Sequence, residues 1–479
     1  MTAQTPCFID GEDVATDRTY DNIDPSTGGL IGTVSLGGPA EVARATKAAR
    51  AAQPGWHAMS PARRADILDE ISRRILGEVE GLSRLESEDT GKPISQAVND
   101  VRVCARYFQF YSRAIETFYG ATIPMGEGFE VFTTNEPYGV IGHILAWNYP
   151  MQLFARAVAP AIATGNAVVV KPADETPRTA VRIAQLAIAA GLPAGVLNVV
   201  TGTGSEAGAA LSGSPDVDQI GFVGSTEVGR LIASSAAGQL VPAVLELGGK
   251  SPHIVFADAD LDEVVPTVVK TIIQNAGQTC SAGSRLLVDR RIHERLISRV
   301  SEAMQRVTVG RGIDDPELGP LISTKQLGRV EGYVNEASGT VVTGGHRLET
   351  EFGGCYFAPT LIDGVDPLSK IAQEEIFGPV LVAMAFDDEK EAIEQANATE
   401  YGLIAAVWTA DIDRAFRVSR ALRVGQVFVN NFGASGGVEL PFGGVKKSGY
   451  GREKGVEALL ATTQTKATVL KVASASVRS

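Results

Sequence analysis

The run Val140-Ile141-Gly142-His143-Ile144-Leu145-Ala146 decides the fold, because it begins a regular alternation of two patterns. It has the length and the apolar character of a buried strand. Further strand-like runs follow it at Ala167–Val170, Val196–Val200, Gln219–Val223 and Ala243–Leu247. Helical patterns separate these runs, at about 151–164, 176–190, 204–213 and 226–236. This βαβ series predicts an α/β fold with a parallel sheet that carries helices on both faces.

Polar residues and glycines stand where these strands end. They are Trp147-Asn148, Lys171-Pro172, Gly202-Thr203-Gly204 and Gly224-Ser225-Thr226. Ligands of open parallel sheets bind beyond the carboxyl ends of the strands. The sequence therefore predicts a ligand site along this edge of the sheet.

A second alternating series begins near Ser251 and predicts a second α/β domain. Its strand-like runs are 252–256, 285–288, 404–408 and 426–430, and its helical patterns are 261–276, 292–307, 388–398 and 413–421. Two strand-like segments lie outside both series. The run Phe129–Thr134 alternates like an exposed strand in an arm that leaves its domain, and 461–472 is isolated in the sequence. Because a lone strand needs a partner, we expect the terminal one to pair with another subunit.

Helical periodicity also marks the first part of the chain, at about 39–52, 60–90 and 93–119. Ser60 followed by Pro61 predicts an N-cap with proline in the first helical position.

Length, charge and cysteine content limit the class of protein. A chain of 479 residues is too long for one ordinary core, and a net charge of −13 argues against a nucleic-acid partner. The four cysteines are far apart, which predicts neither a metal site nor a disulfide framework and indicates a reducing compartment. The short polar N-terminus has no signal-peptide pattern and no apolar run is long enough to span a membrane, so we expect a cytoplasmic location.

One of these cysteines, Cys280, stands in a glycine-rich segment. The segment is Asn275-Ala276-Gly277-Gln278-Thr279-Cys280-Ser281-Ala282-Gly283-Ser284-Arg285. Such a segment can bend sharply and bring backbone N–H groups close to a substrate, where a thiol can attack a carbonyl. Taken alone, a cysteine is more often a small buried hydrophobe. Its partners elsewhere in the chain favour the chemical interpretation.

Seven segments, in this order and spacing, closely resemble the NAD(P)-dependent aldehyde dehydrogenase superfamily over about Phe8 to Val472. They are Ala146–Pro150, Val170–Pro177, Phe222–Gly229, Leu245–Lys250, Gly277–Arg285, Glu374–Pro379 and Pro441–Gly449. The resemblance implies a discontinuous Rossmann-like NAD-binding domain at 1–119 and 137–248 and a catalytic α/β domain at 249–455. It also implies a small β oligomerisation arm at 120–136 and 456–479, and a homodimer or homotetramer.

The resemblance implies a role for three catalytic residues. Cys280 would be the nucleophile, and its backbone N–H and the Asn148 side chain would form the oxyanion hole. Removing one such donor typically costs about 3 kcal/mol of barrier. Glu246 would activate the water that hydrolyses the thioester. Without the resemblance, Glu246 would be interpreted as a strand-end carboxylate paired with a lysine, and Asn148 as a turn former.

The resemblance also implies sets of cofactor and substrate residues. Lys171 and Asp174 would bind the adenosine ribose, and the Asp174 carboxylate favours NAD over NADP, although Asp is shorter than the glutamate common there. The other cofactor residues would be Trp147, Gly204, Gly208, Phe222, Gly224, Ser225, Gly229, Leu247, Glu375 and Phe377. The substrate pocket would be lined by Arg156, Ser281, Gly436 and Phe442.

Two departures from the family pattern concern the substrate. Arg156 stands where many relatives carry tryptophan, and small residues fill 433–437 where many carry aromatic ones. Arg156 would either stack on an aromatic aldehyde or pair with the carboxylate of a semialdehyde, or it would turn away to a structural acidic partner. The small residues favour the aromatic substrate.

The function implied is oxidation of an aldehyde to its acid with reduction of NAD or NADP. The alternatives are a semialdehyde dehydrogenase and a member that passes the acyl group to coenzyme A. Members that use coenzyme A usually lack the base at the position of Glu246. A non-catalytic protein of the same fold is opposed by the presence of Asn148, Glu246 and Cys280.

Overall fold

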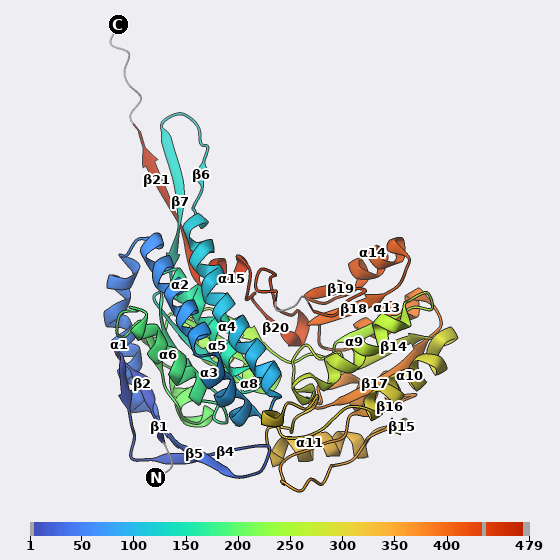
Figure 1. Cartoon of the computed structure of the whole chain (residues 1–479). Coiled ribbons are helices and arrows are strands. Elements are labelled where there is room, and N and C mark those ends of the chain that lie inside the picture. The colour runs from blue at the N-terminus through green and yellow to red at the C-terminus, as the bar shows by residue number, and fades with distance from the viewer. Residues whose placement is uncertain (1–3, 434–436, 473–479) are drawn as a thin grey trace.

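The computed structural model describes residues 4–433 and 437–472. The protein has two lobes, and the first is built on an eight-stranded sheet (Figure 1). From edge to edge the strands are β20 (Gly449–Tyr450), β12 (Ala243–Glu246), β11 (Gln219–Val223), β8 (Val140–Ile144), β9 (Ala167–Lys171), β10 (Leu197–Val199), β2 (Cys7–Ile9) and β3 (Glu12–Val14). The run from β12 to β10 is parallel, and β20, β2 and β3 are antiparallel to their neighbours. The predicted parallel sheet is confirmed.

Helices cover both faces of this sheet, because alternate strand residues point to opposite sides. Val140 and Ile144 of β8 join the core under α1 (Pro39–His57), α7 (Ala209–Ser212) and α8 (Thr226–Gln239). Ile141 faces the other core, under α5 (Pro150–Ala163) and α6 (Arg178–Ala189). Outside these two lie α2 (Pro61–Gly77), α3 (Val79–Thr90) and α4 (Ile94–Ala114).

Local signals set the limits of these helices. Ser60 caps α2 as predicted, since its side chain accepts a hydrogen bond from the N–H of Arg63. The helix expected over 204–213 is instead a π-helical turn, Gly204–Gly208, followed by the short α7. Thr203 caps the turn by accepting from the N–H of Glu206.

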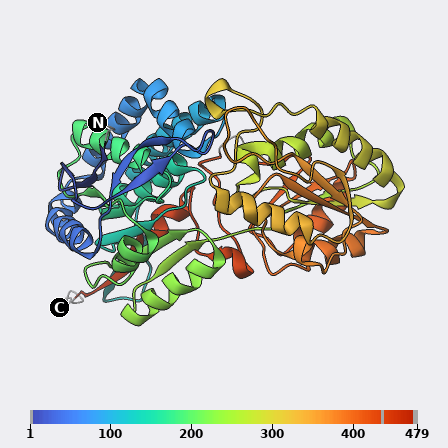
Figure 2. The same ribbon diagram turned by 90° about the horizontal axis from the view of Figure 1, so that it is seen from below.

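The second lobe contains a seven-stranded sheet and lies beside the first (Figure 2). Its strands in order are β15 (Thr340–Thr343), β16 (Thr360–Asp363), β17 (Val380–Phe386), β14 (Arg285–Asp289), β13 (Pro252–Val255), β18 (Ile404–Trp408) and β19 (Gln426–Val429). All pairs are parallel except the one that β15 makes. Its helices are α9 (Leu261–Ile273), α10 (His293–Gln305), α11 (Thr324–Asn335), α12 (Lys370–Gln373), α13 (Glu389–Asn397) and α14 (Ile412–Ala421).

An arm of three antiparallel strands extends away from the first lobe (Figure 1). They are β6 (Thr122–Ile123), β7 (Phe129–Pro137) and β21 (Thr463–Lys471). β21 pairs with β7 along its whole length, from Thr463 opposite Pro137 to Lys471 opposite Phe129. The expectation that the terminal strand would lack a partner in its own chain was therefore wrong, because two segments remote in sequence supply each other's hydrogen bonds.

The remaining elements connect these parts. β1 (Gln4–Thr5), β5 (Leu30–Ser35) and β4 (Thr19–Ile23) form a small sheet, and α15 (Glu457–Ala461) leads into β21. β20 lies within the range 249–455 assigned to the second domain, yet it pairs with β12 of the first sheet. Within the described ranges, none of the helices combines the length and the apolar character that crossing a bilayer requires.

Candidate active site

A cavity of about 1550 Å³ is lined by residues of both lobes. The first lobe contributes Asn148, Ser225 and Glu246, which follow or end β8, β11 and β12. The second contributes Cys280, which follows α9, and Phe377, which precedes β17. Parallel strands end at the same edge of a sheet, so Asn148, Ser225 and Glu246 converge. Cys280 and Phe377 reach the same cavity from loops that precede β14 and β17 of the second sheet.

The backbone before Cys280 turns sharply. α9 ends earlier than its periodic pattern predicts, and Asn275, Ala276 and Gly277 all have left-handed φ values, of 49°, 53° and 71°. Left-handed non-glycine residues are strained and persist where the surroundings hold them. A Cβ on Gly277 would meet the backbone of Gly378, so a larger residue does not fit. The turn carries Cys280 out of the helix and into the cavity.

Asn148 is hydrogen-bonded to the cysteine-bearing segment, although the two belong to different lobes. Its Nδ2 donates to the backbone carbonyl oxygen of Gln278 at 2.9 Å, and Nδ2 of Asn275 donates to the backbone carbonyl oxygen of Asn148 at 2.7 Å. The Gln278 side chain is itself held, because Nε2 donates to the Asn275 carbonyl and Oε1 accepts from the N–H of Ile322. These bonds fix the Asn148 amide close to the residues before Cys280.

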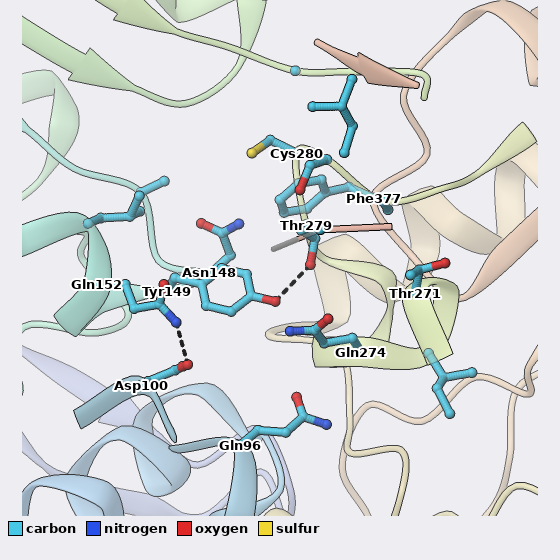
Figure 3. Close-up of a pocket in the computed structure, with 18 of the residues that line it drawn as sticks. Gln96, Asp100, Asn148, Tyr149, Gln152, Thr271, Gln274, Thr279, Cys280 and Phe377 are labelled. Atoms are coloured by element: carbon cyan, nitrogen blue, oxygen red, sulfur yellow. Dashed lines mark hydrogen bonds between the residues drawn. The ribbon is translucent and has the colours of Figure 1, made fainter. Parts of the chain in front are cut away.

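Tyr149 provides a further contact between the lobes. Its hydroxyl lies 3.0 Å from the Thr279 hydroxyl, next to Cys280 (Figure 3). The ammonium of the buried Lys92 lies 4.4 Å from the centre of the tyrosine ring. Lys92 in turn forms ion pairs with Glu86 and Asp100. Glu86 and Asp100 therefore balance the buried charge of Lys92 beneath the tyrosine ring.

Burial shifts the pKa values of Cys280 and Glu246. It raises the pKa of the Cys280 thiol to about 12, and the charge of Arg156 opposes the rise. Burial also raises the pKa of Glu246 well above its ordinary value, and the nearby Glu453 adds to this shift. Neither carboxylate oxygen of Glu246 has a hydrogen-bond partner within the described residues. A buried carboxyl of raised pKa facing a thiol suits proton transfer at neutral pH.

Arg156 is turned toward protein groups. It is 6% exposed, its Nε pairs with Glu453, and its guanidinium carbon lies 5.0 Å from the centre of the Phe442 ring. Of the three uses considered from the sequence, this arrangement corresponds to the structural acidic partner. Arg156 and Phe442 still line the cavity, together with Ser281.

A second group of expected residues surrounds the other part of the cavity. The rings of Trp147 and Phe377 meet edge to face, with their centres 5.2 Å apart. Glu375 accepts a hydrogen bond of 3.0 Å from the N–H of Gly249, and burial raises its pKa to about 7. Trp147, Phe377, Glu375 and Leu247 all line the cavity. An aromatic pair beside a carboxylate provides both an apolar and a hydrogen-bonding surface.

The N-terminus of α8 opens onto the same cavity. Ser225 caps the helix by accepting from the N–H of Val228, and Gly224 and Ser225 are lining residues. Phe222 and Gly229 support this end from behind. A Cβ on Gly224 would lie 2.5 Å from the Phe222 ring, and one on Gly229 would lie 2.6 Å from Leu247. Close packing against Leu247 therefore explains why residue 229 is a glycine.

The expected adenosine residues lie at the same sheet edge, outside the cavity lining. Lys171 ends β9 with its side chain 3% exposed, and it pairs with Asp174, whose side chain is 38% exposed. Gly204 and Gly208 bound the π-helical turn after β10. Gly436 lies outside the described residues.

Three charged residues of the cavity region were not predicted from the sequence. Glu175 lines the same cavity as the residues expected to bind the cofactor, and burial raises its pKa. Glu453 pairs with Arg156, and Lys454 lines the cavity beside Phe442. Glu175 directly follows Asp174, so its position in the sequence could have identified it. Glu453 and Lys454 follow the last glycine motif without any periodic pattern, so no sequence signal identified them.

The Cys280 thiol, the Asn148 amide and the buried Glu246 carboxyl all line the cavity between the two lobes. The sequence model of the aldehyde dehydrogenase family matches residues 12–468. The chain belongs to the aldehyde dehydrogenase family.

Individual relatives cover almost the whole chain. The Arabidopsis thaliana aldehyde dehydrogenase family 2 member B4, mitochondrial, is 41% identical over 98% of this chain and 88% of its own length. A solved putative aldehyde dehydrogenase of Burkholderia cenocepacia is 48% identical, with a TM-score of 0.96, covering 98% of this chain and 100% of that one. The P. syringae indole-3-acetaldehyde dehydrogenase AldA, solved with NAD+ and IAA, is 40% identical with a TM-score of 0.96 over 98% of this chain and 97% of that one.

Proposed function

We propose that this protein oxidises an aldehyde to the carboxylic acid through a covalent intermediate on Cys280. The thiolate adds to the carbonyl carbon, and the oxygen takes up the negative charge beside the Asn148 amide and the Cys280 N–H. Loss of hydride from that carbon leaves a thioester. Glu246 then removes a proton from water, which attacks the thioester and releases the acid and the thiol. The observation that carries the proposal is the hydrogen bonding of Asn148 to the segment that bears Cys280.

The residues at the other part of the cavity fit a nicotinamide dinucleotide. Its chemistry would be to accept the hydride. The first N–H groups of α8 have no intrahelical partner and suit a pyrophosphate, while Glu375 suits a ribose hydroxyl. Trp147 and Phe377 offer apolar surface to the nicotinamide ring. Lys171 and Asp174 would bind the adenosine ribose. Gly204 and Gly208, expected from the sequence, would shape the surroundings of the adenosine.

We propose NAD as the preferred cofactor. The half-exposed Asp174 carboxylate would repel a 2′-phosphate, although its pairing with Lys171 weakens the repulsion. The specificity constant for NAD should exceed that for NADP by about tenfold or more, since like charges placed together cost several kcal/mol. In the variant Asp174→Asn the difference should narrow. Steady-state kinetics with both cofactors measure this, and equal constants in the wild type would remove the argument.

The substrate end supports an aromatic aldehyde. Phe428, Phe432 and Phe442 line the cavity there and provide ring surfaces. The Arg156 guanidinium does not provide the surface for stacking on an aromatic aldehyde that was one of the uses considered from the sequence. It already contacts Glu453 and Phe442. Hydrolysis is favoured over acyl transfer to coenzyme A by the presence of Glu246 in the cavity.

NADH formation from a panel of aldehydes, with and without coenzyme A, tests the function. Turnover should need only aldehyde and NAD, and it should yield the free acid. A requirement for coenzyme A would replace hydrolysis by acyl transfer. The absence of NADH formation with every aldehyde would reject the function.

We further propose a homodimer or homotetramer assembled through the arm, in a cytoplasmic location. β21 is an edge strand of the arm, and Val469 and Leu470 on it are 60% and 51% exposed. An exposed apolar edge strand is a surface for pairing between chains. A chain ending at residue 462 should therefore sediment as a smaller species than the full chain. The variant Leu368→Lys, which changes an exposed leucine of the second lobe, should keep the assembly. An unchanged oligomer after truncation would contradict the proposal.

A further inference from the structure

Two cations lie against one aromatic ring at the substrate end of the cavity. The guanidinium carbon of Arg156 is 5.0 Å from the centre of the Phe442 ring, and Nζ of Lys454 is 4.9 Å from it. All three residues line the cavity. The two cations differ in what balances their charge.

The charge of Arg156 is balanced within the protein. Glu453 forms an ion pair with its Nε, and both side chains are almost completely buried, at 7% and 10% exposure. A buried pair of this kind holds both partners, because separating them would leave an uncompensated charge. Arg156 is therefore not available to bind a substrate anion.

The charge of Lys454 is not balanced in the same way. Within residues 4–433 and 437–472, its Nζ has neither a carboxylate within ion-pair distance nor a hydrogen-bond acceptor. Glu453 is engaged by Arg156, and Glu246 has a raised pKa that favours its neutral form. The Lys454 backbone has a φ of 62°, a left-handed conformation that the surroundings must maintain. A half-buried ammonium thus faces the cavity without a counter-ion among the described residues.

The position of Lys454 limits the length of any molecule that reaches it. Phe442 belongs to a small apolar cluster with Leu403 and Ile404, and Cys280 packs against that cluster. The ammonium of Lys454 lies against the same Phe442 ring. An aldehyde carbon bound at the thiol and an anion bound at the ammonium would consequently be separated by a short spacer.

We propose, building on the aldehyde oxidation proposed above, that Lys454 binds a carboxylate at the far end of the substrate and selects short aldehydes that carry one. A single ammonium is a point charge that suits one monoanion, whereas a phosphate calls for several donors or an arginine fork. Phe442, Phe428 and Phe432 accommodate the spacer, whether it is aliphatic or aromatic. The preferred substrate class is therefore an aldehyde acid.

Matched pairs of aldehydes test this inference. Succinic semialdehyde is compared with butanal, and 4-formylbenzoate with benzaldehyde, in the wild type and in Lys454→Met, which keeps the length and removes the charge. Loss of the charge should reduce kcat/KM for the carboxylated member of each pair by about tenfold or more, mainly through KM. The neutral member should change by about twofold or less. Lys454→Arg should retain most of the preference.

Two controls separate Lys454 from its surroundings. Lys270→Met removes an exposed lysine on α9 at the rim of the cavity and should leave the preference for carboxylated aldehydes unchanged. Arg156→Met should lower kcat/KM for all four aldehydes by a common factor, because it leaves Glu453 buried and unpaired. A selective loss on the carboxylated aldehydes in Arg156→Met, together with an unchanged preference in Lys454→Met, would instead assign the anion to Arg156 and overturn the proposal.

The pH dependence gives an independent readout. Burial, followed by the charge of Arg156, lowers the pKa of Lys454 to about 8, and Cys280, Glu453 and Glu246 also face it. A carboxylate needs the protonated amine, so the preference should be present below about pH 8 and lost as the pH rises through it. The ratio of kcat/KM within each pair isolates Lys454, since the other groups affect both members equally. A ratio that does not change with pH would contradict the assignment.

Failure of the inference differs from failure of the proposed function. Oxidation of neutral and carboxylated aldehydes with equal kcat/KM overturns the role of Lys454 and leaves the oxidation intact. If no aldehyde is oxidised, the function fails, and binding is then measured by protection of the Cys280 thiol from iodoacetamide. Succinate should protect better than butyrate in the wild type and equally in Lys454→Met. Equal protection in the wild type would overturn the inference.

Discussion

Cys280→Ala should lose aldehyde oxidation, by a factor on the order of 10⁴ or more, because it removes the atom that forms the covalent intermediate. NADH production with benzaldehyde and succinic semialdehyde measures the loss. NAD binding, measured by calorimetry, should be unchanged, since the residues that fit the dinucleotide are Trp147, Ser225, Glu375 and their neighbours.

The other cysteines provide the control for this variant. Cys355 is buried in the core of the second lobe, away from the cavity lining. Cys355→Ala should keep full turnover at a modest cost in stability. Substantial turnover in Cys280→Ala would show that the thiol is not the nucleophile, and the covalent mechanism would be wrong.

Glu246→Gln should separate the two halves of the reaction. The amide keeps the size of the side chain and cannot accept the proton from water, so hydrolysis of the thioester should slow by about 10²–10⁴-fold. Hydride transfer precedes that step. A rapid burst of NADH close to one equivalent per active site should therefore be followed by slow turnover. Equal loss of the burst and of the later phase would indicate that Glu246 activates the thiol instead.

The pH dependence of thioester hydrolysis should differ between the wild type and Glu246→Gln, because the pKa of the wild-type carboxyl is raised. Burial and the nearby Glu453 favour its protonated form, and only the ionised form is a base. Wild-type hydrolysis should rise with pH through the pKa of Glu246 and then level off. The variant should lack this rise, and stopped-flow measurement of the slow phase across pH detects the difference.

Periodicity predicted the elements well, because burial of one face determines both the pattern and the structure. The ranges expected for β11 and β18 coincide with the strands Gln219–Val223 and Ile404–Trp408. The turn before Cys280 was expected from its glycines, but not the left-handed Asn275 and Ala276 inside an apparently helical pattern. Local propensity there gives way to contacts made by remote parts of the chain.

The direction of side chains and the pairing of remote segments could not be predicted from the sequence. The pattern around Arg156 does not encode Glu453, which lies almost 300 residues further on. The partner of β21 is β7 of the same chain, a pairing across more than 300 residues that no local signal specifies. Lys454 has no motif of its own and becomes visible only when the cavity is assembled.

In the proposed reaction, the Asn148 amide would divide its two hydrogens between two tasks. The bond from Nδ2 to the Gln278 carbonyl uses one hydrogen and fixes the plane of the amide. The second hydrogen would then be free to donate to the substrate oxygen when charge develops on it, without rearrangement of the side chain. A side chain that offers one hydrogen, such as serine, would have to choose between orientation and catalysis. Asparagine would satisfy both requirements, and the segment that carries Cys280 would set the direction of the donor that stabilises the proposed intermediate.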